Sequence, residues 1–255
     1  MTLLLLSSLG AFAQYTYFPN SGVIHYEKTV HIKNYLRTYN SLSKDDNYDK
    51  DIINELINKA PTTYVYKSKL SFDGEQSRYE PIKEELPAIM RNLSWYRFDL
   101  GGSYYQDLKN KTMSSVSDFA GIDLRIQDDL LPVKWKVTNE FREIAGYNCR
   151  RANGVVMDSV YVVAFYTDDI PLSVGPGALH GLPGMILGLS IPDRHTNIYA
   201  TKVEFSQPSV SPLAQKKKDK NLKRGEINNL LRERFNVGEW FTEKQFSFNL
   251  ISIFL

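Results

Sequence analysis

One stretch decides the fold: Tyr64-Val-Tyr-Lys-Ser-Lys-Leu-Ser-Phe-Asp-Gly-Glu-Gln-Ser-Arg-Tyr-Glu80. From residue 64 to residue 72, Tyr, Ser, Leu and Phe at even positions alternate with Val, Lys and Ser at odd positions. An alternation of period two is typical of a half-buried β-strand. Asp73-Gly74 is a strong signal for a tight hairpin turn, and a returning strand is expected near residues 76–80. The stretch therefore predicts a β-hairpin.

Strand character recurs on both sides of this hairpin. Lys109-Asn110-Lys111 reads as a second hairpin turn, whereas Gly146 and Gly154 are assigned to connections. Most gaps between the strands are too short for the crossover helices that parallel strands need, so the pairing is expected to be antiparallel. Further strands are predicted at residues 22–32, 95–108, 134–141, 148–156, 161–166, 185–191 and 197–205.

Two segments have helical periodicity. Residues 42–60 carry Ile52, Ile53, Leu56 and Ile57 among polar residues, and Pro61 ends the pattern. Residues 226–235 form the second candidate. With at least eight strands against so few helices, the expected class is mainly β (α+β): a single curved antiparallel sheet or half-open barrel, partly covered by one or two helices.

Composition limits the function classes. Apolar residues make up 42% of the chain and charged residues 24%, which is ordinary for a globular protein. The formal charge of +2 is too small to indicate a nucleic-acid partner. Cys149 is the only cysteine, so no intramolecular disulfide is possible, and we expect it to be a buried structural residue.

The N-terminus reads as a signal peptide over residues 1–13. A short apolar run ends in Ala11-Phe12-Ala13, the small-x-small pattern of a signal peptidase site, and cleavage would leave Gln14 first. No Lys or Arg precedes the run, which leaves open a start upstream of Met1. The run is too short to span a bilayer, and no Cys follows the cleavage site to take a lipid. We expect an exported protein that is periplasmic or associated with the outer membrane, without a lipid anchor or a transmembrane span.

The sequence predicts that the chain after the signal peptide has two parts: a sheet domain over residues 14–206 and a C-terminal region over residues 207–255. A basic run from Lys216 to Arg224 is either a solvated linker or a contact for anionic lipid headgroups or an acidic partner. The apolar tail, residues 246–255, is open to three interpretations: an edge strand, a partner-binding tail or the product of a disrupted reading frame.

Four ordered blocks resemble the GLPGLI family. The last of them along the chain, residues 175–189, contains the motif that gives the family its name. It reads Gly-Pro-Gly-Ala-Leu-His-Gly-Leu-Pro-Gly-Met-Ile-Leu-Gly-Leu, with Met185 where the name has Leu. The other blocks are Trp135-Lys-Val137, Ile144-Ala-Gly-Tyr-Asn-Cys-Arg-Arg-Ala152 and Ala164-Phe-Tyr-Thr-Asp-Asp-Ile-Pro171. The resemblance covers roughly residues 22–205. It implies an exported envelope protein of uncharacterised molecular activity.

The loop at residues 175–184 contains four Gly and two Pro, which shape a backbone strongly. In one interpretation it is a tight connection that leads into a buried strand. In the other it is a rim that touches a ligand or partner. The candidate contact residues are Leu179, His180, Leu182, Pro183 and Asp168.

The signs of catalysis are weak. The four histidines show no zinc-binding spacing such as His-Glu-x-x-His, and the Gly-rich loop lacks the Lys-Ser/Thr of a phosphate-binding loop. No metal or cofactor is therefore expected. The leading hypothesis is a non-enzymatic binding or accessory protein, for a hydrophobic ligand on the concave face of the sheet or for an envelope partner. The alternatives are a periplasmic hydrolase that uses Asp168 and His180, and a structural partner of an outer-membrane receptor.

Overall fold

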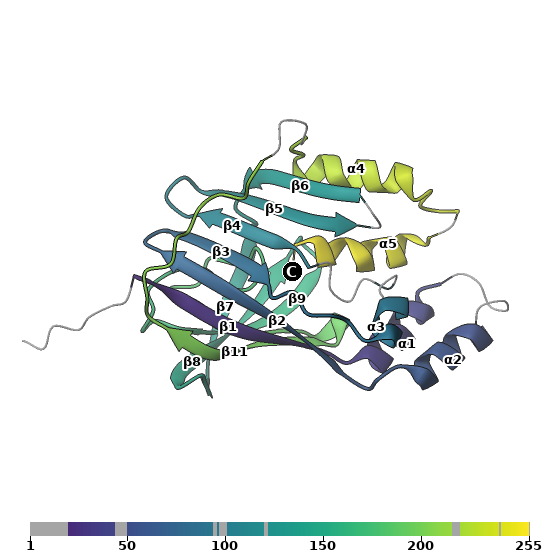
Figure 1. Cartoon of the computed structure of the whole chain (residues 1–255), viewed down its shortest axis with the longest axis horizontal. Helices are drawn as coiled ribbons and strands as arrows, with labels where there is room; N and C mark the ends of the chain where they lie inside the picture. Colours follow the sequence, from purple (N-terminus) through teal and green to yellow (C-terminus); the bar gives the residue numbers. More distant parts are fainter. Residues whose placement is uncertain are drawn as a thin grey trace, which may run out of the picture.

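The structure, a computed structural model, describes residues 20–43, 50–93, 96, 101–119, 122–215, 220–239 and 241–254. The predicted signal peptide and Lys216–Asp219 of the basic run lie outside these residues. The body is one antiparallel sheet of 11 strands that does not close on itself (Figure 1), which confirms the predicted class. The strand order is β6-β5-β4-β3-β2-β1-β11-β10-β9-β8-β7.

This order follows the chain with a single exception. Strands β1 to β6 form one meander and strands β7 to β11 a second, and pairing of β1 with β11 joins them. The two edge strands, β6 and β7, are consecutive in sequence but do not pair with each other. The bounds are β1 Ser21–Val30, β2 Tyr64–Asp73, β3 Gln76–Pro81, β4 Ser103–Asp107, β5 Thr112–Phe119, β6 Ile122–Asp129, β7 Val133–Ile144, β8 Tyr147–Val156, β9 Val160–Thr167, β10 Met185–Ile191 and β11 Thr196–Glu204.

The alternating sequence sets which side chains face the core. In the predicted hairpin, Asp73 lies opposite Gln76 and Leu70 opposite Tyr79, so the Asp73-Gly74 turn is confirmed. The even positions from residue 68 to residue 72 are buried, as the period-two pattern requires. The second hairpin, between β4 and β5, is also confirmed, because the Asp107 carboxylate accepts the backbone N–H of Asn110 at 2.9 Å. Gly154, assigned to a connection, instead lies within β8.

Three helices form a second core cluster beyond one end of the sheet. The predicted helix of residues 42–60 is confirmed as α2, Lys50–Lys59, whereas α1, Ile32–Ser41, and α3, Ala88–Leu93, lie in segments for which no helix was expected. The buried residues of α1 recur at helical spacing (Ile32, Tyr35, Leu36 and Tyr39) and pack with Phe248 from the C-terminal region.

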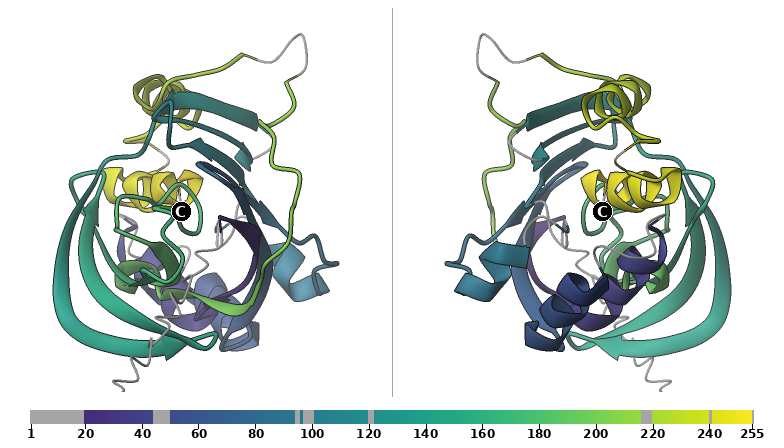
Figure 2. Two further views of the ribbon diagram at one scale, coloured as in Figure 1. Left: turned by 90° about the vertical axis from the view of Figure 1, so that its left-hand side faces the viewer. Right: turned by 90° about the vertical axis from the view of Figure 1, so that its right-hand side faces the viewer.

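The sheet curves into a trough whose open side is spanned by the C-terminal helices. Figure 2 shows the C-terminal end of the chain inside this trough and α5, Glu243–Leu250, lying across it. The predicted helix of residues 226–235 is confirmed as α4, Arg224–Arg234. The apolar tail therefore folds as α5 and a short 3-10 turn, not as an edge strand. Side chains of both helices and the tail are buried in the main core: Ile227, Leu231, Phe246, Ile253 and Phe254.

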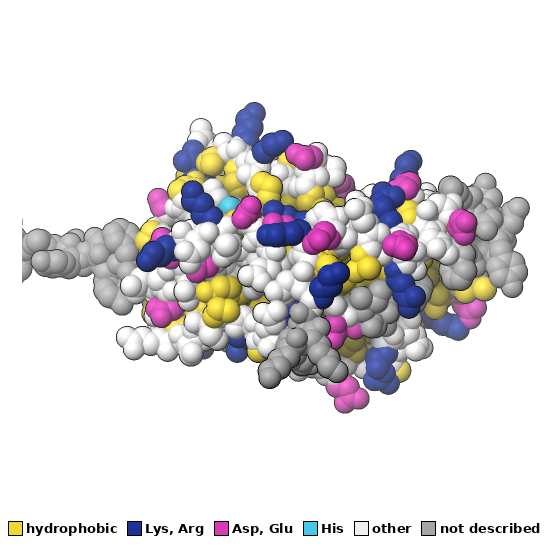
Figure 3. All heavy atoms as spheres, turned by 90° about the horizontal axis from the view of Figure 1, so that it is seen from above, with side chains coloured by type: hydrophobic (Ala, Val, Ile, Leu, Met, Phe, Trp, Pro, Cys, Tyr) yellow, Lys and Arg dark blue, Asp and Glu magenta, His cyan; other side chains and the backbone are white. Residues whose placement is uncertain are grey.

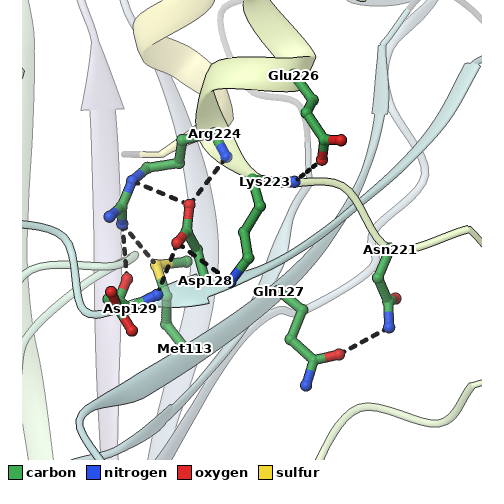
Figure 4. Close-up of polar contacts among 8 residues, drawn as sticks. All are labelled: Met113, Gln127, Asp128, Asp129, Asn221, Lys223, Arg224 and Glu226. Carbon is green, nitrogen blue, oxygen red and sulfur yellow. Dashed lines mark hydrogen bonds and ion pairs between the residues drawn. The ribbon is translucent and has the colours of Figure 1, made fainter.

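The described part of the basic run attaches α4 to the edge strand β6 (Figure 4). Leu222 pairs with this edge through its backbone. Its N–H donates to the Arg125 carbonyl at 2.9 Å, and its carbonyl accepts from the Gln127 N–H at 3.1 Å. The backbone N–H of Arg224 donates to Asp128 at 2.9 Å, and its guanidinium donates to the Asp129 carbonyl at 2.7 Å. These residues thus help to anchor the C-terminal region to the sheet.

Charges of both signs are mixed on the face of the molecule that lies above the view of Figure 1. Figure 3, which looks down on the molecule from above Figure 1, shows Lys and Arg side chains interspersed with Asp and Glu. Within the described residues, no helix is long and apolar enough to cross a membrane. This mixed face and the net charge of +2 do not indicate a nucleic-acid partner.

Candidate functional site

The loop at residues 175–184 lies inside the trough. Leu179 is 0% exposed and Leu182 is 2% exposed, and both belong to the main core. The second of the two interpretations, a rim that offers Leu179 and Leu182 to a ligand or partner, would need these leucines to be exposed, and they are buried. The physical reason is the curvature of the sheet: it leaves a wide apolar interior, and burying this loop removes its leucines from water. The concave face of the sheet, proposed as a ligand surface, is covered by the protein's own chain.

Side chains from both arms of the trough hold the loop. Gln106, on β4, donates from Nε2 to the carbonyls of Gly177 and Leu179, at 3.4 Å each. Trp135, on β7, donates its indole N–H to the His180 carbonyl at 2.8 Å. The loop thus bridges the space between the two meanders near their unpaired edges.

Two glycines of the motif are required by the backbone. A Cβ atom on Gly184 would lie 2.0 Å from the Thr167 carbonyl oxygen, so any side chain there would collide with β9. Gly181 has φ +97, a conformation that L-residues rarely adopt, and it lies against the Trp135 ring. The loop then leads directly into β10, which is buried at six of its seven positions. The interpretation as a tight connection before a buried strand is confirmed.

Asp168 and His180, the residues of the alternative hydrolase hypothesis, make separate contacts in the part of the chain that the structure describes. His180 is partly buried, and its Nε2 is 2.8 Å from the Leu131 carbonyl in the link between β6 and β7. Burial lowers the pKa of His180 below its ordinary value, and the Leu131 hydrogen bond opposes this only in part. Asp168 and Pro183 are exposed near the end of β9, and no described contact joins Asp168 to His180. The Ser173 hydroxyl accepts the Gly181 N–H at 2.8 Å.

Open space lies on the outer surface. Three cavities within the described residues have volumes of about 420, 330 and 250 Å³, and none of them is lined by residues 175–184. The cavity of about 330 Å³, here named the Arg194 cavity, lies between the β10–β11 connection, the β8–β9 turn and α5. Its lining residues are Ser159, Val160, Asp193, Arg194, Glu243, Lys244, Ser247, Phe248 and Ile251.

Arg194 is the unusual residue of this cavity. It ends a 3-10 turn, Pro192–Arg194, and is only 5% exposed. Its guanidinium carbon stands 3.4 Å from the centroid of the Phe248 ring. In the sequence, Asp193-Arg194 reads simply as a turn between two strands, and no motif marks this arginine. Only the packing of α5 against the turn reveals it.

A second unusual feature is the edge strand β7. Eight of its twelve residues are exposed, and within the described chain it pairs only with β8. Phe141 is 57% exposed, and Val137 is also exposed. The pairing with β8 is irregular between these two residues, as in a β-bulge. This strand is therefore an accessible sheet edge with apolar side chains.

Cys149 is buried, as predicted. Burial, together with the charge of Asp169, raises the pKa of its thiol to about 12, so the thiol is held in its protonated, unreactive form. Among the described residues there is no cluster of three or more His, Cys, Asp or Glu side chains that could hold a metal ion.

Comparison with known proteins finds a similarity to an uncharacterised family over part of this region. A family model described as "Protein of unknown function (Porph_ging)" matches residues 153–188. The match runs from within β8 through β9 and the Gly-Pro loop into β10. No curated protein matches the chain. Over this buried strand-loop-strand segment, the chain is thus similar to a family of unknown function.

Proposed function

We propose that this chain is an exported accessory protein of the bacterial cell envelope that binds an extended segment of a protein partner along β7. We also propose that it is a GLPGLI family member, on the strength of the four ordered sequence blocks. The match to an uncharacterised family over residues 153–188 is consistent with this. The single observation that carries the proposed binding mode is the long, exposed and singly paired edge strand.

An exposed strand edge presents backbone N–H and C=O groups that a further strand can pair with. On β7 these groups are accompanied by Phe141 and Val137, which offer apolar contacts to an added strand. Charged side chains on the same strand, among them Lys134, Lys136 and Glu143, are exposed and disfavour indiscriminate pairing. The edge is thus better suited to a specific partner than to self-association.

The occupied interior favours a binding site on the surface edge over one inside the trough. The curved sheet encloses its own loop and C-terminal residues, so a hydrophobic ligand inside the trough would have to displace Leu179, Phe246 or Phe254. The alternative, a hydrolase, is not favoured by the contacts of His180, whose Nε2 is engaged by a backbone carbonyl. A partner strand can reach the β7 edge without displacing core side chains and without breaking the hydrogen bond of His180.

Site-specific photo-crosslinking in the producing cells tests the proposal. A photoreactive phenylalanine analogue replaces Phe141 in the full chain, and the matched control carries it at Phe205, which is 49% exposed beyond the end of β11. We expect a discrete envelope-protein adduct from position 141 and not from position 205. Phe141→Lys should also reduce adduct formation from a probe at Val137. Equal adduct patterns at positions 141 and 205 would reject β7 as the binding edge.

Export is tested separately. Mass spectrometry of the protein from the envelope fraction should find an N-terminus at Gln14, the position after the small-x-small pattern. A cytoplasmic protein that retains residues 1–13 would contradict the proposed localisation without bearing on the β7 edge.

A further inference from the structure

The Arg194 cavity contains a buried positive charge with which no carboxylate of the described residues forms an ion pair. Arg194 is 5% exposed, and its Nε and Nη1 groups have no hydrogen-bond partner among the described residues. Nη2 donates to the Ser247 carbonyl at the long distance of 3.3 Å, and the Tyr35 hydroxyl also interacts with the guanidinium. Buried N–H groups of a charged side chain are costly when they have no acceptor.

The acidic residues nearby do not supply the missing counter-ion. Glu243 lines the same cavity but is engaged by Arg232, whose Nη1 and Nη2 reach its two carboxylate oxygens at 2.7 and 2.5 Å. The charge of Asp193 raises the pKa of Arg194 less than burial lowers it, and within the described chain no carboxylate forms an ion pair with Arg194 within 4.0 Å. Burial dominates and lowers the pKa of Arg194 to about 10, so the group remains charged at neutral pH.

The walls of the cavity are partly apolar. Val160, Phe248 and Ile251 line it beside the guanidinium, and Lys244, in the first turn of α5, adds a second cation. Its volume of about 330 Å³ is at the lower end of the range for small-molecule sites. A fitting ligand therefore combines an anionic group with a small apolar body.

We propose that the Arg194 cavity binds a small organic carboxylate, with its oxygens at Arg194 and its apolar body against Phe248, Val160 and Ile251. A carboxylate carries one negative charge and matches the one buried cation. A phosphate dianion fits less well, because Asp193 on the same wall would repel its second charge and because phosphate has no apolar body for the apolar walls. The site does not involve β7, so this inference stands apart from the proposed partner binding.

Calorimetric titration of the purified full chain with hexanoate, hexanol and inorganic phosphate tests the site. Hexanoate should bind, and hexanol, which has the same apolar body without the charge, should bind about tenfold or more weakly. Phosphate should bind more weakly than hexanoate. Absence of hexanoate binding at millimolar concentrations, or equal binding of hexanol, would overturn the proposal.

Two substitutions locate the binding. Arg194→Met removes the cation but keeps an apolar chain over Phe248, and it should weaken hexanoate binding about tenfold or more. The matched control, Arg37→Met, alters an exposed arginine on α1 and should leave the affinity unchanged. Equal affinities of Arg194→Met and wild type would place the ligand elsewhere and reject the site.

A third variant keeps the test decisive if Arg194→Met does not fold. Ser159→Trp leaves Arg194 in place and introduces a large ring from an exposed position on the cavity wall. It should preserve the melting temperature and reduce hexanoate binding. Wild-type affinity in a folded Ser159→Trp protein would show that hexanoate does not occupy this cavity.

Discussion

Replacing Leu179 by Ala tests whether the Gly-Pro loop is a structural part of the interior. Leu179 is 0% exposed within the main core, in the loop that Gln106 and Trp135 hold between the arms of the trough. Removing a buried leucine side chain costs its transfer free energy plus a cavity term, together about 2–5 kcal/mol. We expect a loss of about 3 kcal/mol in the free energy of unfolding, a large share of the stability of a typical domain.

Equilibrium unfolding in urea, followed by tryptophan fluorescence and circular dichroism on the full chain, measures this loss. The matched control is Leu230→Ala on α4, because Leu230 is 40% exposed and its truncation should change the free energy of unfolding by roughly 0.5 kcal/mol or less. If Leu179→Ala costs no more than Leu230→Ala, the loop is not packed in the trough, and the argument for a filled interior fails.

Two further predictions concern titratable groups. Cys149, whose pKa burial raises to about 12, should not react with a thiol reagent in the native protein but should react fully after unfolding in urea; rapid native labelling would contradict its burial. Because burial lowers the pKa of His180, its contribution to stability is complete above the ordinary histidine pKa of about 6.5 and is lost as the pH falls towards the lower folded-state value. As the pH falls through that interval, the free energy of unfolding of His180→Gln, measured by urea titration, should therefore decrease less than that of the wild type. The same pH dependence in both proteins would show that His180 does not cause the loss of stability.

The sequence predicted most strands because their signals are local. The alternation from residue 64 to residue 72 and the Asp73-Gly74 turn specify a hairpin without help from distant residues. Helix α1 was missed for the opposite reason: its apolar stripe includes Tyr35 and Tyr39, and aromatic residues have modest helix propensity. Its burial against Phe248, more than 200 residues away, stabilises it as a helix.

The candidate site was much less predictable. Glycine and proline indicate a shaped loop, but a shaped loop has the same sequence whether it lies at the rim or in the interior. Likewise, Asp193-Arg194 has the sequence of an ordinary turn, although α5 converts it into a buried cation beside a cavity. The unpaired edge at β7 was equally hidden, since it depends on which strands meet across the sheet.

The sequence by itself thus determined the antiparallel, strand-rich body, because side-chain alternation and turn residues act over a few neighbouring positions. The tertiary structure decided that the trough holds its own loop and C-terminal tail, that Arg194 is buried beside a surface cavity, and that β7 lies at an exposed edge of the sheet. Burial and edge exposure result from contacts between segments far apart in the chain, and no local pattern encodes those contacts.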